Sequence, residues 1–387
     1  MENRSGTMNI IAQDGAVVNI YAAEKVNLIT AKRLAKAKIK REERKEEEKK
    51  PILARWQDHK RDAMLVADRL YDIGLYKRGY NIRMCGQDLV FSRCSDCGHI
   101  EIKEAQLCRD RLCPVCNWRL SIKRYAKMSA IMSACYSRRP DACYSLVTLT
   151  ARTCPYDDLG QYLSQMQTAW QALINQRWAK QCMIGWARAI EATYSDRMHA
   201  LHPHYHMVLI TERRGDVRRI VDEWLRQCQK RGLVADVKAQ DISDIKSSDK
   251  AGTSFAGAIC EVYKYTVKTL DLLSMPLGAL RGLAVGLAGK RLVSFGGLIK
   301  QLAKELDADN LDEVDEPGDN DPIKLCTHCG SQKLDELSLK WSLSGNRYIA
   351  MCSDDATAAD DLQRIIDNAC KIRDGRYIQS RYLFHPD

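Results

Sequence analysis

The chain has 387 residues, 45% of them hydrophobic and 28% charged, a composition that excludes collagen, wholesale disorder and a membrane bundle and predicts two or three globular domains. Its formal net charge is +10, although residues 304–322 hold nine acidic residues and one lysine. The rest of the chain therefore carries about +18, which favours nucleic acid as a partner, ahead of an anionic membrane surface. No apolar run is long enough to span a membrane and no secretory signal is visible, so we expect a cytoplasmic protein.

The first 90 residues carry two recognisable elements. Residues 8–21 alternate loosely in hydrophobicity and hold the turn pair Asp14 and Gly15, which predicts a small hairpin. Residues 24–60 are rich in Lys, Arg, Glu and Ala, with opposite charges three and four apart, a pattern typical of a solvated helix. The sequence divides into an N-terminal extension (1–90), a cysteine-rich module (91–140), a core (141–303) in which strand-like and helix-like periods alternate, an acidic linker (304–322) and a C-terminal region (323–387).

The sixteen cysteines favour metal binding over disulfides, because cytosolic thiols stay reduced. Two CxxC pairs separated by 15 residues have the spacing of a four-cysteine structural zinc site. The predicted Zn²⁺ ligands are Cys94, Cys97, Cys113 and Cys116. Cys108 and His99 are further candidates for this site. Cys326 and Cys329 form a third CxxC pair, which leaves a second zinc site in the C-terminal region open.

Basic and aromatic side chains surround the second CxxC pair. Trp118 and Tyr125 lie among five cations, a combination that suits base stacking and phosphate contact. The cations are Arg109, Arg111, Arg119, Lys123 and Arg124. The alternative is a solvated basic face with no ligand.

Four of the eight histidines fall within residues 199–206, just before a strand-like apolar run. Because side chains alternate along a strand, His204 and His206 point to one face, with Tyr205 opposite. Two imidazoles on one face can chelate one cation. The alternative is a strand whose histidines are satisfied by hydrogen bonds.

An acidic residue upstream completes a candidate ligand set. Residues 187–194 also alternate, and a hairpin connection at 195–201 would bring Glu191 beside the histidines. A carboxylate with two imidazoles suits Mn²⁺ or Mg²⁺, although imidazole also accepts Zn²⁺. His202 lies in phase with the pair, but Pro203 can bend the strand there, so we rank His202 below Glu191.

Residues 255–270 have the pattern of an amphipathic helix. Glu261 and Tyr265 are four apart and share one face, with Lys264 and Lys268 beside them. A phenol, with a pKa near 10, becomes a useful nucleophile only where a metal or cationic groups stabilise its oxyanion. Taken alone, such a tyrosine is more typical of a core or an interface.

The order of these motifs resembles that of the HUH endonucleases, and most closely that of plasmid rolling-circle replication initiators (Rep) of the single-tyrosine type. Residues 290–300 resemble the closing segment of that family, and the resemblance covers roughly residues 94–302. The stretches that carry it are CRDRLCPVCNWRLS (108–121), SLVTLT (145–150), HPHYHMVLI (202–210) and EVYKYTVK (261–268).

The resemblance implies an α+β fold, an antiparallel sheet with helices on its faces, for residues 141–303, beside the zinc-binding module. Residues 145–150 match a central strand next to the site. By the same resemblance, His204, His206 and Glu191 bind the divalent cation. Tyr265 matches the nucleophile, with Lys264 and Lys268 beside it, and Glu261 matches the glutamate that activates water at termination.

The implied activity is metal-dependent, strand-specific nicking and joining of origin DNA, single-stranded and duplex, through a 5′-phosphotyrosine. The free 3′-hydroxyl would prime a host DNA polymerase, and a host helicase would unwind the duplex, since no Walker phosphate loop is present. No membrane partner is expected. The alternatives are an HUH transposase or relaxase, a histidine-triad nucleotide hydrolase, and a non-enzymatic zinc-dependent DNA-binding regulator.

Overall fold

The computed structural model describes residues 50–246, 259, 269–306 and 325–351, with the backbone of 9–11, 17–19 and 253–254. The chain divides into two compact units, Met1–Arg55 with Ile365–Asp387, and Trp56–Arg364. In the first unit, β1 (Asn9–Ile11) pairs antiparallel with β2 (Val17–Asn19), as the sequence of residues 8–21 predicts. All the sites described below lie in the second unit.

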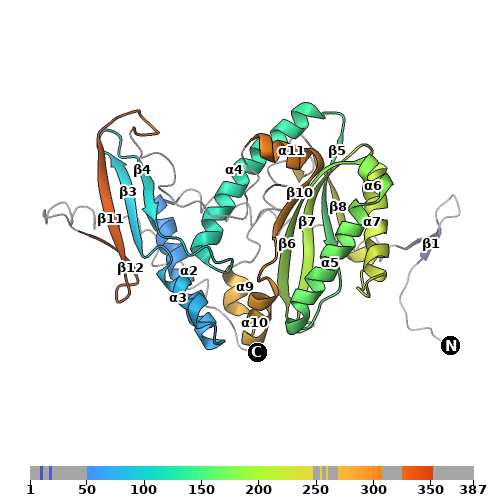
Figure 1. Ribbon diagram of the computed structural model, residues 1–387, viewed down its shortest axis with the longest axis horizontal. Helices are drawn as coiled ribbons and strands as arrows, with labels where there is room; N and C mark the ends of the chain where they lie inside the picture. The colour runs from blue at the N-terminus through green and yellow to red at the C-terminus, as the bar shows by residue number, and fades with distance from the viewer. Residues whose placement is uncertain are drawn as a thin grey trace. The chain divides into compact units, whose positions relative to one another are not determined.

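The second unit contains a six-stranded sheet of order β10-β6-β7-β5-β8-β9 (Figure 1). Neighbouring strands are antiparallel, except for β8 and β9, which are parallel. The strands are β5 (Cys143–Thr150), β6 (Met183–Ser195), β7 (Ala200–Thr211), β8 (Asp241–Lys246), β9 (Thr253–Ser254) and β10 (Val293–Gly296). The hairpin predicted between β6 and β7 is present, with Ser195 paired to Ala200.

One face of this sheet packs against α4 (Pro114–Arg138) and α11 (Gly297–Glu305). Val208 and Ile210 of β7, fully buried, join apolar side chains of both helices in one core cluster. Each such side chain stabilises the fold by about 1.5–3 kcal/mol relative to an exposed one. This core holds β6 and β7 against the two helices.

The other face packs against α5 (Leu159–Ile174) and α7 (Arg214–Gln229) (Figure 1). Tyr205 of β7 contacts Trp224 of α7, with ring centroids 5.7 Å apart, and a tryptophan of α5 packs edge-on against one of β6. Helices thus cover both faces of the sheet, which confirms the predicted fold class. Three shorter helices are α6 (Arg177–Cys182), α9 (Thr269–Ser274) and α10 (Leu277–Gly286).

A four-stranded antiparallel sheet of order β12-β11-β3-β4 lies in the same unit. Its strands are β3 (Asp88–Cys94), β4 (Ile100–Ala105), β11 (Leu334–Ser342) and β12 (Arg347–Ala350). Helices α2 (Ile52–Asp72) and α3 (Tyr76–Met84) precede it. Trp56 of α2 packs edge-on against Phe91 of β3, and Tyr348 of β12 donates a hydrogen bond to the carbonyl of Gly86 at 2.6 Å.

Two structural observations concern the predicted boundaries. Residues 323–387 were expected to form a region of their own, but β11 and β12 complete the sheet of β3 and β4. Pairing with β11 covers an edge of β3 that would otherwise expose unpaired backbone groups, and such a distant pairing leaves no local sequence pattern. Lys304 and Glu305, the first two residues of the predicted linker at 304–322, belong to α11.

Several predicted segments lie outside the described residues. They include most of the charged helix at 24–60, of which α2 contains only the last part, the acidic segment from residue 307 and most of the helix at 255–270. Within the part of the chain that is described, no helix combines the length and apolar character needed to cross a lipid bilayer.

Candidate functional site

The hairpin of β6 and β7 brings Glu191, His204 and His206 onto one face of the larger sheet. Glu191 pairs directly with His204 in the register, and His206 pairs with Ala189 two residues away. The side chains therefore meet because of strand periodicity and one antiparallel register. The sequence predicts this juxtaposition from the same two properties. We call these three residues the histidine cluster.

The side-chain atoms of the histidine cluster converge on one point. The Nε2 atoms of His204 and His206 are 3.1 Å apart, and the nearer carboxylate oxygen of Glu191 lies 3.3 Å and 2.9 Å from them. Glu191 and His204 are buried, while His206 is partly exposed. A ligand oxygen and two ligand nitrogens at this spacing could hold one cation and leave open coordination positions.

Neighbouring groups fix the orientation of both imidazoles. His204 Nδ1 donates to the carbonyl of His202 at 3.1 Å, and His206 Nδ1 lies 3.2 Å from Oγ1 of Thr148 on β5. With Nδ1 engaged, each ring turns Nε2 toward Glu191 as a metal ligand requires. Thr148 belongs to the strand at 145–150, which the sequence predicts beside the site and which pairs with β7.

His202 lies beside the histidine cluster and outside it. Its Nε2 is 3.1 Å from Oγ1 of Thr150, and burial, followed by the proximity of His204, lowers its pKa to about 4. A neutral, hydrogen-bonded imidazole fits a supporting position. The group of side chains that could share one metal ion contains Glu191 and not His202.

The predicted nucleophile and its neighbours lie outside the described residues. These are Tyr265, Glu261, Lys264 and Lys268; helix α9 begins at Thr269, directly after them. Their roles therefore stay predictions.

The cysteines do not group as predicted. The single site expected from Cys94, Cys97, Cys113 and Cys116 is split, and each CxxC pair joins a different second pair. Cys94 and Cys97 meet Cys326 and Cys329, with Sγ separations of 3.5 Å for Cys94–Cys329 and 3.6 Å for Cys97–Cys326. We call this set the strand cluster, because Cys94 ends β3 and the other pair precedes β11.

The second pair belongs to what we call the helix cluster, formed by Cys85, Cys108, Cys113 and Cys116. The Sγ atom of Cys116 lies 3.5 Å from that of Cys85 and 3.7 Å from that of Cys108. Cys113 is the N-cap of α4 and Cys116 lies in its first turn, where the helix dipole favours thiolates. His99, the other spare candidate, belongs to neither cluster.

Backbone geometry at the strand cluster suits a bound metal. Both of its pairs read CxxCG, and the glycines, Gly98 and Gly330, have φ of +71° and +74°. Each glycine N–H donates to the carbonyl of the first cysteine of its pair at 2.8 Å. The Cys113 pair lacks this glycine and begins a helix instead. The shared CxxCG pattern was therefore the sequence signal that could have matched the two strand-cluster pairs.

A buried cation lies next to the helix cluster. Lys60 of α2 is fully buried, and its Nζ donates to the carbonyls of Arg83 and Cys85 at 2.6 Å and 2.8 Å. Burial lowers the pKa of Lys60 to about 8. Four thiolates around one divalent cation carry a net charge of about −2, so a neighbouring ammonium fits a metal–thiolate site better than four neutral thiols.

Some of the aromatic and basic residues that were expected to contact nucleic acid are buried in the core. Trp118 is buried, stacks on His59 with ring centroids 4.7 Å apart and contacts Trp56 edge-on. Arg124 is also buried, and Arg111 donates to the carbonyl of Leu287 at 2.9 Å. Stacking of a base on Trp118 is therefore excluded, since helix α2 already covers its ring.

The sequence of this chain is similar to those of known replication proteins. Residues 99–349 match the pattern of a family described as Replication protein. A relative named Protein rep from Streptococcus pneumoniae serotype 2 (strain D39 / NCTC 7466) is 29% identical over 267 residues, which are 67% of this chain and 82% of that protein. Protein rep of Lactiplantibacillus plantarum is 25% identical over 305 residues, 76% of this chain and 94% of the relative.

A Replication protein of Staphylococcus aureus is 26% identical over 208 residues, 50% of this chain and 86% of that protein. No solved structure matches the chain. The family match runs from just after the strand cluster's first pair, through strands β6 and β7 that carry the histidine cluster, to β12.

Proposed function

The chain belongs to the Replication protein family, the plasmid replication initiators that its sequence resembles, and from this premise we propose that it starts replication by nicking one strand of an origin. The observation that carries the proposal is the convergence of Glu191, His204 and His206 on one point. An acidic and imidazole ligand set without thiolate is typical of metal-assisted phosphodiester chemistry.

The histidine cluster would hold a divalent cation, Mn²⁺ or Mg²⁺. Such an ion, when bound, polarises the scissile phosphate and offsets the charge that develops on its oxygens. Thr148 and the carbonyl of His202 keep the imidazoles in place before DNA arrives, so no reorganisation is needed at the moment of reaction.

In the proposed reaction the phenolic oxygen of Tyr265 attacks the phosphorus in line. An O–P bond to tyrosine forms and the P–O3′ bond breaks. The phenol loses its proton as it attacks and the departing 3′-oxygen takes one up, so the step consumes no net proton. Lys264 and Lys268 would stabilise the phenolate. At the end of a round, Glu261 would take a proton from water or a hydroxyl that displaces the tyrosine.

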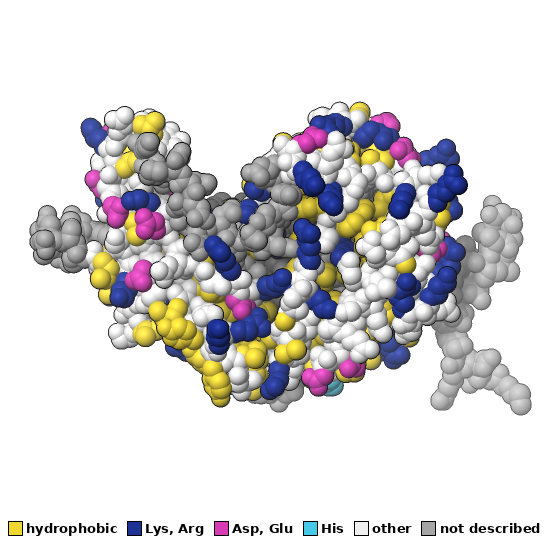
Figure 2. All heavy atoms as spheres, viewed as in Figure 1, with side chains coloured by type: hydrophobic (Ala, Val, Ile, Leu, Met, Phe, Trp, Pro, Cys, Tyr) yellow, Lys and Arg dark blue, Asp and Glu magenta, His cyan; other side chains and the backbone are white. Residues whose placement is uncertain are grey.

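Charge on the described surface supports a DNA partner. On the face drawn in Figure 2, Lys and Arg side chains lie over the helices that cover the larger sheet, with few Asp and Glu side chains among them. Exposed cations of α7 include Arg214, Arg218, Arg219 and Arg226. Such a surface attracts phosphates without reading sequence, and the resulting affinity falls with salt.

The two cysteine clusters are proposed to hold structural Zn²⁺. Four sulfur ligands without an open position give closed tetrahedral sites, which stabilise folding and do no chemistry. The strand cluster would fix the pairing of β3 with β11, and the helix cluster would fix the start of α4.

The histidine-triad hydrolase is disfavoured by the position of His202. A hydrolase of that kind needs its alternating histidines at one centre, but the Nε2 of His202 bonds to Thr150, and Glu191 occupies the place beside His204.

The proposal is tested by incubating the protein with Mn²⁺ and end-labelled single-stranded fragments of the DNA that adjoins its gene. We expect a covalent protein–DNA adduct and a fragment with a free 3′-hydroxyl. Tyr265→Phe should abolish the adduct, whereas Tyr263→Phe, at the other tyrosine of the segment EVYKYTVK, should leave it. His206→Ala should reduce its rate at least 100-fold, with His202→Ala as the matched control.

Two results would contradict the proposal. An adduct that survives Tyr265→Phe removes this tyrosine from the role of nucleophile. DNA binding without cleavage under Mn²⁺, Mg²⁺ and Zn²⁺ favours the non-enzymatic regulator.

A further inference from the structure

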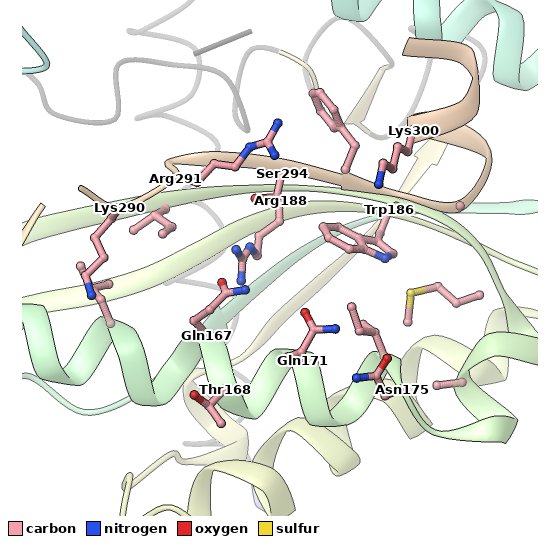
Figure 3. A pocket seen from close by; sticks show the side chains of 18 of the residues that line it. Gln167, Thr168, Gln171, Asn175, Trp186, Arg188, Lys290, Arg291, Ser294 and Lys300 are labelled. Atoms are coloured by element: carbon pink, nitrogen blue, oxygen red, sulfur yellow. The ribbon is translucent and has the colours of Figure 1, made fainter. Parts of the chain in front are cut away.

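A cavity of about 950 Å³ lies between α5, the edge strand β10 and the neighbouring strand β6 (Figure 3). It is on the opposite face of the sheet from the histidine cluster. Along β6, Arg188 and Ile190 line the cavity, whereas Glu191 faces the other side. Strand alternation therefore separates the two places by the thickness of the sheet.

Arg188 is the unusual residue of this cavity. Its side chain is 2% exposed, and within the described part of the chain Nε and Nη1 have no hydrogen-bond partner. The guanidinium stacks on Tyr205, with Cζ 4.4 Å from the ring centroid, and Figure 3 shows it directed toward α5. Burial lowers the pKa of Arg188. A buried guanidinium with unsatisfied N–H donors destabilises a fold, so an anionic ligand is the natural partner for these two donors.

The cavity lining is strongly basic. Among the described residues that line it there are five cations and no carboxylate: Lys180, Arg188, Lys290, Arg291 and Lys300 supply the positive charge. Lys290 donates to Ser164 of α5, which ties the loop before β10 to that helix. A low-dielectric cavity of one sign concentrates the opposite charge.

Neutral donors face the cations from α5. Gln167 and Gln171 are four apart on one stripe of α5 and their amides point into the cavity, and Asn175, the residue after the helix, also lines it (Figure 3). Trp186 of β6 adds a flat aromatic surface beside them. The lining thus combines a planar guanidinium, ammonium groups, amides and an indole, which together suit a phosphate attached to a base.

We propose that this cavity binds the phosphate of a nucleotide, separately from the histidine cluster. Its volume exceeds the needs of a lone phosphate and lies in the range of small-molecule sites. The phosphate could belong to a free nucleotide or to a single DNA strand. Arg188 is the anchor, and Lys300, exposed at the rim, adds charge. The inference does not depend on the nicking reaction.

Titration calorimetry on the full chain tests the proposal, with inorganic phosphate, dAMP and pentathymidylate as probes. Arg188→Met keeps the length of the side chain and removes the charge, and it should weaken binding at least tenfold. Lys300→Gln should weaken it about threefold to tenfold. Lys304→Gln, one turn further along α11 and outside the cavity lining, is the matched control and should leave binding unchanged.

Thermal unfolding without ligand shows whether Arg188 stabilises the fold or serves only in binding. If Arg188 is kept for a ligand, Arg188→Met should unfold at the same or a higher temperature, because an unpaired buried charge is removed. Binding of dAMP indicates a free nucleotide, and binding of pentathymidylate alone indicates a DNA strand. The proposal is overturned if no probe binds at millimolar concentration, if Lys300→Gln and Lys304→Gln weaken binding equally, or if Arg188→Met unfolds earlier and binds normally.

Discussion

The strand cluster and the helix cluster each consist of four cysteines, but the surroundings of the two clusters differ. In the strand cluster, Cys97 and Cys329 are exposed and the two pairs are more than 200 residues apart in the chain. In the helix cluster, all four cysteines lie between residues 85 and 116, and Cys113 is fully buried. With a metal bound at each, the helix cluster would stabilise the core, and the strand cluster would hold β11 against β3, which lies far earlier in the chain.

The largest expected effect comes from Cys113→Ser. The change removes a ligand from a buried site and leaves charged thiolates without compensation, a loss of about 3–5 kcal/mol or more. We expect loss of one zinc equivalent and cooperative unfolding of the second unit, measured by urea denaturation and metal analysis. Cys135→Ser is the control, since Cys135 is fully buried in α4 and belongs to neither cluster. Equal destabilisation by both changes would contradict a metal role.

Cys329→Ser should have a smaller and more local effect. We expect loss of the other zinc equivalent and about 100-fold faster amide exchange in β11, which corresponds to about 3 kcal/mol. Amide exchange in the larger sheet should be unchanged. Cys182→Ser, outside both clusters, should leave exchange in β11 as it is. If exchange rises across both sheets, the two clusters do not act separately.

Lys60→Met tests whether a buried ammonium group stabilises the helix cluster. It deletes two hydrogen bonds from a buried ammonium to the carbonyls of Arg83 and Cys85, with an expected loss of about 2 kcal/mol. Zinc should leave the helix cluster faster, while the strand cluster keeps its ion. Lys77→Met, on the exposed surface of α3, is the control. A uniform change at both clusters would argue against Lys60 as a countercharge.

Gly330→Ala should have the smallest effect, a loss of about 1 kcal/mol from a φ of +74°. An added Cβ meets no atom within 4 Å, so only backbone strain contributes. Gly289→Ala has a similar φ, +67°, and the same free space. Both variants should lose similar stability by thermal unfolding, but only Gly330→Ala should speed zinc release. Equal rates of zinc release from the two variants would mean that Gly330 has no part in metal retention.

Local patterns predicted the histidine cluster well. Glu191, His204 and His206 meet through strand periodicity and a short hairpin, both of which are visible within twenty residues. The resemblance supplied the sheet with helices on its faces. These features needed no knowledge of distant contacts.

Distant contacts account for what the sequence did not predict. Three CxxC pairs can combine in several ways, and only the pairing of β3 with β11 places Cys326 beside Cys97. Cys85 has no CxxC spacing at all. Trp118 was expected to face DNA, but the packing of α2 buries it. The cavity at Arg188 depends on where α5 and β10 meet, which no motif records.

The strand cluster has a consequence for how the protein is made. Cys326 follows Cys97 by 229 residues, and at typical elongation rates the ribosome needs roughly 10–50 s to cover that distance. During this interval the nascent polypeptide exposes a half-site of two thiols. A product of premature termination keeps that half-site permanently, so only near-complete translation closes it.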